Sequence, residues 1–146
     1  MEQIIKNFEE LTTTELYEIL KVRAEVFVVE QECVYNDIDE KDKAAIHIIL
    51  QENTGIVAYA RVLPVGVKFE KEVSIGRVLT KARGTGLGKR LMETAIATAQ
   101  EKLNAKSIRI EAQAHATGFY EKVGFVVDSQ EFLEDDILHV EMIWRG

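Results

Sequence analysis

Apolar residues recur at helical spacing in two long stretches of the chain. In residues 87–103 an apolar side chain stands at every fourth position, which predicts an amphipathic helix with one face toward a protein core. The residues of that face are Leu87, Leu91, Ala95, Ala99 and Leu103. In the other stretch, Thr12 and Glu15 make a capping box that predicts a helix start, and apolar positions continue from Leu16 to Phe27. A short third helix is expected over residues 117–123, with Gly124 directly after it.

Short apolar runs between turn residues predict the strands. The predicted strands are Gln3–Phe8, Ala45–Leu50, Ile56–Leu63, Val73–Leu79, Ser107–Gln113, Phe125–Asp128 and Leu138–Trp144. The turn sequence Glu52–Gly55 joins two of them as a hairpin. Because the early strands form hairpins and the later ones alternate with helices, the pattern predicts an α/β (α+β) fold. The expected architecture is a mixed central sheet of about six to seven strands with helices on both faces.

Length and composition predict a single domain, residues 1–146. With 47% hydrophobic and 29% charged residues, the chain resembles ordinary globular domains that bury a core. The first ten residues lack the apolar centre of a signal peptide, and no apolar run is long enough for a bilayer. The single cysteine excludes an internal disulfide, so we expect a cytoplasmic protein without a membrane partner. A net charge of -7 argues against nucleic acid as the main partner.

A glycine-rich stretch, Arg83-Gly84-Thr85-Gly86-Leu87-Gly88, stands where the longer helix is predicted to begin. The first N–H groups of a helix lack intrahelical partners and the helix dipole is positive there, so the stretch predicts an anion site. Residues 73–92 agree, because they contain five Lys or Arg and no Asp or Glu. A dinucleotide fingerprint would need glycine in place of Lys89, and a P-loop would need glycine in place of Arg83 and Ser or Thr in place of Arg90. Both motifs are therefore excluded.

The spacing of Arg83, Gly86 and Gly88 resembles the loop that binds the acetyl-CoA pyrophosphate in the GNAT superfamily of N-acetyltransferases. The segments Ile75–Val78 before the loop and Phe119–Phe125 after the helix are similar to the remaining core of that family. The resemblance narrows to the ElaA-like branch and covers nearly the whole chain. It rests on Val26–Gln31, Cys33, Asp39, Asp42, Gln113–His115 and His139–Met142.

The chain departs from the family pattern in two places. The connector Leu79–Ala82 is shorter than the family's link between strand and loop, and Asp136 and Leu138 replace a glycine and a proline of the closing motif. The first departure affects the individual backbone contacts to coenzyme A. The second affects the rim of the acceptor site.

The resemblance implies acetyl-CoA as co-substrate and no metal. The strands over 73–79 and 107–113 would part to receive the pantetheine arm, and a backbone N–H near Val78 would stabilise the oxyanion. The acetyl group would pass directly to an amine, with Tyr120 as general acid for the departing thiolate. Packing of the third helix is the other role open to Tyr120. The implied cofactor contacts are Val78, Leu79, Arg83, Gly84, Thr85, Gly86, Leu87, Gly88 and Lys89.

The proton that the attacking amine loses has several candidate acceptors. Glu30, Glu111 and His139 come first, His47 and His115 follow, and a chain of water molecules is an alternative. For each of these side chains an ion pair or a structural hydrogen bond is the competing role. The expected contacts to the acceptor substrate are Arg23, Glu30, Gln31 and Gln113.

Acidic residues gather in one segment, at positions 37, 39, 40 and 42, that shows neither strand nor helix periodicity. Without the EF-hand pattern, the segment is predicted to be a solvated loop or a loop that attracts a cationic amine, from a small molecule or a peptide. Arg23 falls on the apolar stripe of the first helix. It is either paired with a structural carboxylate or placed in a cleft to bind a ligand. Cys33 is expected to be a buried thiol.

Two functions other than catalysis are also compatible with an anion site: an acyl-CoA sensor without turnover, and a nucleotide-binding module. A homodimer formed through edge strands is a further option. The sequence does not identify the acceptor.

Overall fold

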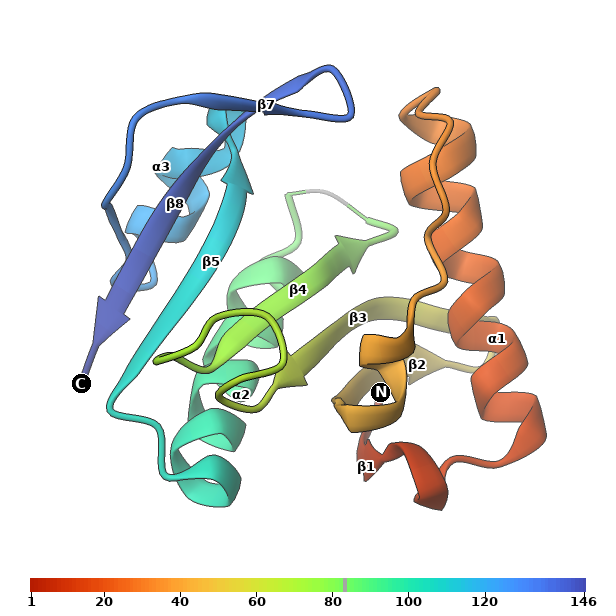
Figure 1. Cartoon of the computed structure of the whole chain (residues 1–146). Helices are drawn as coiled ribbons and strands as arrows, with labels where there is room; N and C mark the ends of the chain where they lie inside the picture. Colours follow the sequence, from red (N-terminus) through yellow and green to blue (C-terminus); the bar gives the residue numbers. More distant parts are fainter. Residues whose placement is uncertain (83) are drawn as a thin grey trace.

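The computed structural model describes residues 1–82 and 84–146, and it arranges them as two antiparallel sheets with helices packed against them (Figure 1). One sheet has the strand order β1-β2-β3-β4; the other has the order β5-β8-β6, and β7 also pairs with β8. The strands are β1 (Glu2–Asn7), β2 (Ile46–Glu52), β3 (Gly55–Leu63), β4 (Ser74–Thr80), β5 (Ser107–Gln113), β6 (Val126–Val127), β7 (Phe132–Glu134) and β8 (Ile137–Arg145). The helices are α1 (Thr13–Arg23), α2 (Leu87–Leu103), α3 (Thr117–Glu121), the π-helix η2 (Ala24–Glu30), and the 3-10 helices η1 (Phe8–Glu10), η3 (Glu40–Ala44) and η4 (Ala114–Ala116).

The first sheet is buried on both faces, and the alternation along β2 explains why. Ile48 and Leu50 point into the core that contains Leu91 and other residues of α2. Ile49, between them, points the opposite way and packs with Ile19 of α1. Since neighbouring strand residues face opposite sides, an apolar run without polar interruptions demands a helix on each face. The predicted fold class, with helices on both faces, is confirmed.

The two sheets meet where β4 and β5 begin. A single parallel bridge joins Val73 to Ile108, and the N–H of Arg109 donates to the carbonyl of Val73 at 2.9 Å. Beyond this bridge the described parts of β4 and β5 do not pair, and the two strands run apart toward their carboxyl ends (Figure 1). Each sheet is therefore antiparallel, and the one parallel contact between described strands is the bridge that joins the two sheets. The expected parting of β4 and β5 is observed.

Several element boundaries follow directly from the sequence pattern. The Thr12–Glu15 capping box is present: the N–H of Glu15 donates to Thr12 Oγ1 at 3.0 Å, and the N–H of Thr12 donates to Glu15 Oε1 at 2.8 Å. Helix α2 and strand β5 have the predicted bounds. Helix α3 ends at Glu121, two residues earlier than expected, and Gly124 beyond it has a positive φ of 102°.

The helix that begins at α1 ends at Glu30, within the predicted segment Val26–Gln31, and its last seven residues form the π-helix η2. Two features differ from the predictions. The acidic segment expected to be irregular contains the 3-10 helix η3. The described residues form eight strands and not six to seven, because the three-residue strand β7 has too few residues to show an alternating pattern.

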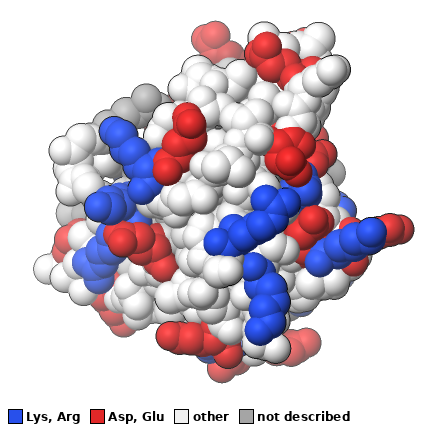
Figure 2. All heavy atoms as spheres, turned by 90° about the vertical axis from the view of Figure 1, so that its left-hand side faces the viewer, with Lys and Arg blue, Asp and Glu red and all other residues white. Residues whose placement is uncertain are grey.

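Charged residues of both signs are interspersed on the face that carries β8 (Figure 2). This face has no broad basic surface of the kind that follows a nucleic-acid backbone. Of the helices in the described part of the chain, none combines the length and the apolar run needed to cross a bilayer.

Candidate acyl-CoA site

The N-terminus of α2 has the geometry of an anion site. Gly86 is the N-cap residue and adopts a left-handed φ of 76°, and Gly84 has a φ of 73°. No side chain caps this helix end, so the N–H groups of its first turn keep their hydrogen-bonding capacity. A Cβ built on either glycine would meet no described atom within 4 Å, which leaves room above the loop. The residues therefore fit a phosphate group. Arg83, predicted to assist here, lies outside the described residues.

Gly88 brings α2 into direct contact with α3. A Cβ on Gly88 would lie 3.0 Å from Cε1 of Phe119 and 3.8 Å from Cγ2 of Thr80, the last residue of β4. A side chain at this position would require the ring of Phe119 to move by a few tenths of an ångström. The glycine stretch, the end of β4 and the aromatic residues of α3 are thus adjacent.

Tyr120 is half-buried beside this loop. Its ring packs edge to face on Phe119, with centroids 5.0 Å apart, and on Phe125 at 6.1 Å. Burial raises the pKa of Tyr120 to about 12, so the hydroxyl keeps its proton at neutral pH. Tyr120 therefore both packs α3 and offers a protonated phenol.

A β-bulge interrupts β4 next to the place where β4 and β5 part. Tyr59 pairs with Leu79 and Arg61 pairs with Gly76, so that Arg77 and Val78 together stand opposite Ala60. Val78 packs against the core under α2, and Leu79 is buried in the cluster under α1. The backbone of the predicted cofactor contacts Val78 and Leu79 therefore lies on a rigidly packed strand end.

Polar side chains line the face of β5 and β8 that is opposite the core. Glu111 and Gln113 alternate with the buried residues of β5, and His139 pairs with Gln113 across the strands. The ring of His139 stacks on Phe132, and its Nδ1 donates to the carbonyl of Ile137 at 2.7 Å. Because a carbonyl oxygen only accepts, a neutral His139 carries its proton on Nδ1 and leaves Nε2 as the acceptor.

Two carboxylates lie on this face, and one of them, Glu134, is next to His139. Glu134 Oε2 lies 3.9 Å from His139 Nε2, and Glu111 Oε1 lies 3.3 Å from Lys68 Nζ. Partial burial, together with a hydrogen bond to Glu111 and the charge of that carboxylate, raises the pKa of Glu134. The polar face of β5 and β8 therefore carries several side chains that can accept a proton.

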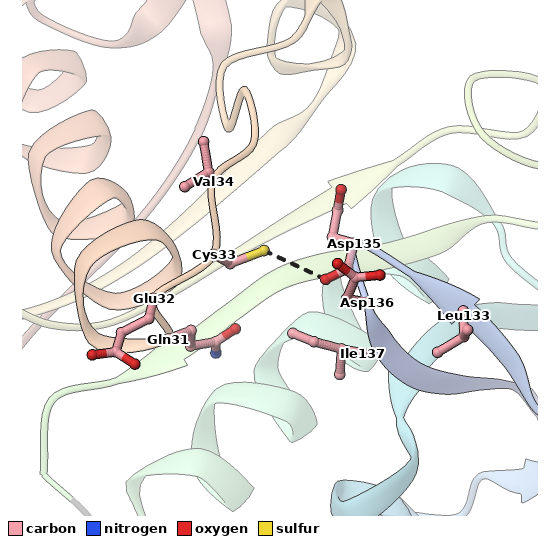
Figure 3. A pocket seen from close by; sticks show the side chains of 8 residues that line it. All are labelled: Gln31, Glu32, Cys33, Val34, Leu133, Asp135, Asp136 and Ile137. Atoms are coloured by element: carbon pink, nitrogen blue, oxygen red, sulfur yellow. Dashed lines mark hydrogen bonds between the residues drawn. The ribbon is translucent and has the colours of Figure 1, made fainter.

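A polar cavity of about 670 Å³ opens at the carboxyl end of η2 (Figure 3). Its wall combines the end of η2 with the tip of the β7–β8 hairpin, and Gln113 Nε2 donates to Gln31 Oε1 at 3.1 Å beside it. The lining residues are Gln31, Glu32, Cys33, Val34, Leu133, Asp135, Asp136 and Ile137. Three of these are acidic, so the cavity favours a cation.

Cys33 is not buried as expected. It is partly exposed in the wall of this cavity, where its Sγ lies 3.8 Å from the carbonyl oxygen of Asp135 (Figure 3). Partial desolvation and the charges of Asp135 and Asp136 raise the pKa of the thiol. A neutral thiol is a weak nucleophile, so Cys33 contributes to the wall of the cavity without supplying a reactive thiolate.

Arg23 is completely buried and binds structural carboxylates. Its Nε donates to Asp37 Oδ2 at 2.8 Å and its Nη1 to Asp42 Oδ1 at 2.6 Å. Arg61 binds Asp39 and Asp42 in the same way. The structural role considered for Arg23 is the one observed, and a side chain without exposed surface does not contact an acceptor.

The acidic segment is therefore not free to attract a cationic substrate. The carboxylates of Asp37, Asp39 and Asp42 are neutralised by arginines, and Glu40 pairs with Lys43 at 2.8 Å. Sequence reasoning missed the partner residue Arg61. The available signal was a single arginine within the otherwise apolar run of β3.

The other candidate proton acceptors, His47, Glu30 and His115, belong to other elements than His139. His47 is fully buried between the hydroxyl of Tyr59, at 2.6 Å, and the carbonyl of Asp42, at 2.9 Å, and burial lowers its pKa. It is thus a structural residue. Glu30 is exposed at the end of η2, next to Gln31, and His115 is exposed in η4.

Comparison with known proteins supports the same fold and the same kind of site. Residues 10–145 match the family described as acetyltransferase (GNAT) domain. The chain belongs to the GNAT acetyltransferase family. Protein ElaA of Escherichia coli is 39% identical over 137 residues, which cover 91% of this chain and 89% of that protein. The predicted resemblance to the ElaA-like branch is confirmed.

Solved structures of the same family superpose along the whole chain. The crystal structure of Escherichia coli ElaA gives a TM-score of 0.91 at 36% identity, and that of an acyl-CoA N-acyltransferase from Pseudomonas aeruginosa gives 0.90 at 37%. Each comparison covers 99% of both chains. Membership of this family supports acyltransferase activity with an acyl-CoA donor.

Proposed function

We propose that this protein transfers an acetyl group from acetyl-CoA directly to an amine. The observation that carries the proposal is the uncapped, glycine-rich N-terminus of α2 beside the carboxyl end of β4, where β4 no longer pairs with β5. The pyrophosphate would be held by the N–H groups of residues 84–89 and by the exposed Lys89. Hydrogen bonds to charged groups contribute about 1.5 to 3 kcal/mol each, so a few of them anchor the donor.

The chemistry assigned to β4 and α3 is a single displacement. The amine nitrogen bonds to the thioester carbonyl carbon, and the N–H of Val78 in the bulge stabilises the resulting oxyanion. When the C–S bond breaks, the electron pair leaves on sulfur, and Tyr120 donates its phenolic proton to the thiolate. The raised pKa of Tyr120 supports this role only in keeping the proton available until the thiolate forms.

The acceptor is assigned to the acidic cavity at the end of η2. Glu32, Asp135 and Asp136 would attract a protonated amine from a small molecule or a peptide, and Gln31, its hydrogen-bond partner Gln113 and the neighbouring Glu30 would add further contacts. The amine must lose a proton before attack. His139 is assigned as the acceptor of that proton, directly or through water, because its Nε2 is unprotonated in the neutral ring.

The proposed function is tested by two measurements on the purified protein. Acetyl-CoA should raise the melting temperature while NAD and ATP should not, and 100 Kd of a ligand specific for the native state adds about 2.7 kcal/mol. Thiol release from acetyl-CoA should then depend on an added amine and fall at least tenfold in Tyr120→Phe, which keeps the ring packing. Stabilisation without thiol release would identify a sensor, and stabilisation by ATP or NAD instead would identify a nucleotide-binding module.

The proposed preference for cationic amines is tested separately. Asp135→Asn with Asp136→Asn should raise KM for cationic amines at least fivefold and leave KM for neutral amines unchanged. Glu131→Gln, which removes an exposed carboxylate outside the cavity, is the matched control. Equal KM changes for both classes of amine would contradict the assignment of the cavity.

A further inference from the structure

The bulge in β4 contains a strained residue. Arg77 has a φ of 49° in the middle of a strand, a left-handed conformation that is unfavourable for a residue with a side chain. Such a conformation persists only where the surroundings hold it. Because Arg77 immediately precedes Val78, its backbone angles set the direction of the Val78 N–H.

The side chain of Arg77 is held mainly by Asp37, in the segment that follows η2. Its Nε lies 2.7 Å from Asp37 Oδ1, and its Nη2 donates to the carbonyl of Asp37 at 3.0 Å. The guanidinium also lies 5.6 Å over the ring of Tyr35. Asp39 Oδ2 stands 3.5 Å from Nη2 and adds a second negative charge.

Asp37 in turn is fixed by buried donors. Arg23 donates from Nε to Oδ2 and from Nη2 to the carbonyl oxygen, both at 2.8 Å, and the hydroxyl of Tyr35 donates to Oδ1 at 2.7 Å. Asp37 is 7% exposed and Arg23 is 0% exposed. A chain of contacts thus connects the fully buried end of α1, through Asp37, to the strained residue of the bulge.

We propose that the Asp37–Arg77 pair is a positioning device that holds the bulge in the conformation in which the Val78 N–H meets the acyl carbonyl. This inference rests on the proposed function, in which that N–H stabilises the oxyanion. Arg77 acts through the backbone and is not a catalytic residue. Because an oxyanion contact strengthens in the transition state, losing its alignment lowers kcat, whereas the pyrophosphate contacts that dominate donor binding stay intact.

Two substitutions of Arg77 separate a backbone role from a side-chain role. Arg77→Ala removes the contact to Asp37 and leaves a residue that avoids positive φ, so the bulge relaxes. Arg77→Gly also removes the contact but tolerates the observed φ. We expect kcat to fall 10- to 100-fold in Arg77→Ala and clearly less in Arg77→Gly, with KM for acetyl-CoA changed less than threefold in both. A guanidinium that touched substrate would give equal losses.

Two further variants and one spectroscopic measurement complete the test. Asp37→Asn keeps the size of the side chain that binds Arg77 but removes its charge. It should lower kcat and change KM for acetyl-CoA less than threefold. Arg109→Ala is the matched control, since Arg109 is 15% exposed, binds three carboxylates and lies at the closed end of β4 and β5. It should lower the melting temperature without lowering kcat. The Val78 amide resonance should shift in Arg77→Ala more than in Arg77→Gly, whether or not an acceptor is present.

The outcomes distinguish this inference from the proposed function. Wild-type turnover with equal kcat values for the Ala and Gly variants, or an unmoved Val78 resonance in Arg77→Ala, would overturn the positioning role alone. Absence of acetyl-CoA binding and turnover in the wild type would overturn the proposed function, and the positioning role with it.

Discussion

Replacing Arg23 with methionine removes the cation at the centre of the buried network. The wild-type guanidinium makes three hydrogen bonds, two to Asp37 and one to Asp42, and it has no exposed surface. Methionine fills a similar volume but donates no hydrogen bond. Asp37 and Asp42, which are 7% and 5% exposed, would then lose these hydrogen bonds and keep only Arg77 and Arg61, respectively, as cationic partners.

The expected loss of stability is large. Removing one partner of a buried ion pair costs about 3–5 kcal/mol, which is a third or more of the free energy of unfolding of many domains. With a urea m-value of about 2 kcal/mol/M, the unfolding midpoint should fall by about 2 M. Trp144, the single tryptophan, packs against the core and provides the fluorescence signal.

An exposed ion pair is the matched control for Arg23→Met. Lys81 Nζ lies 3.0 Å from Glu25 Oε2, but the two side chains are 44% and 42% exposed. Lys81→Met should therefore cost less than about 1 kcal/mol. If Arg23→Met shifted the urea midpoint no more than Lys81→Met, the network would contribute nothing beyond a surface pair, and the reasoning from burial would be refuted.

Three further outcomes follow from the geometry. Although partial burial alone would raise it, the pairing with Arg61 lowers the pKa of Asp39 from 3.8 to about 2. Its contribution to stability is therefore complete above about pH 4 and is lost as the pH falls toward 2, and Arg61→Gln should flatten a plot of melting temperature against pH over that range. Gly88→Ala should cost about 1–3 kcal/mol in urea unfolding because of Phe119, and Phe119→Leu should recover part of that loss. Asp136→Gly should raise the free energy of unfolding by about 0.5 kcal/mol, because Asp136 has a φ of 62°, while Asp136→Ala should lower it.

Features that depend on neighbouring residues were predictable from the sequence. The bounds of α2 follow from its four-residue apolar repeat, and the start of α1 follows from a capping box four residues long. The geometry at Gly86 is similarly local, since a glycine N-cap and an uncapped first turn are properties of one helix end. The expected homodimer and cytoplasmic location stay predictions.

Features that depend on residues far apart in the chain were not predictable. The acidic segment looked solvated because its partners, Arg61 and Arg77, belong to β3 and β4, 19 to 40 residues away. Cys33 looked like a core residue because the β7–β8 hairpin that keeps it at a cavity wall lies 102 residues further on. A pattern within a short stretch of sequence cannot indicate contacts between residues so far apart in the chain.

The same distinction explains why the donor is easier to infer than the acceptor. The proposed donor site consists of the bulge in β4 and the glycine-rich N-terminus of α2, which are close together in the sequence, so a local pattern can indicate it. The acceptor cavity joins Gln31–Val34 to Leu133–Ile137, and only the complete fold brings these segments together. Two acidic groups of similar sequence therefore have different surroundings. The carboxylates after η2 are paired with arginines, whereas those of the hairpin tip line the cavity, where we propose that they bind a cationic amine.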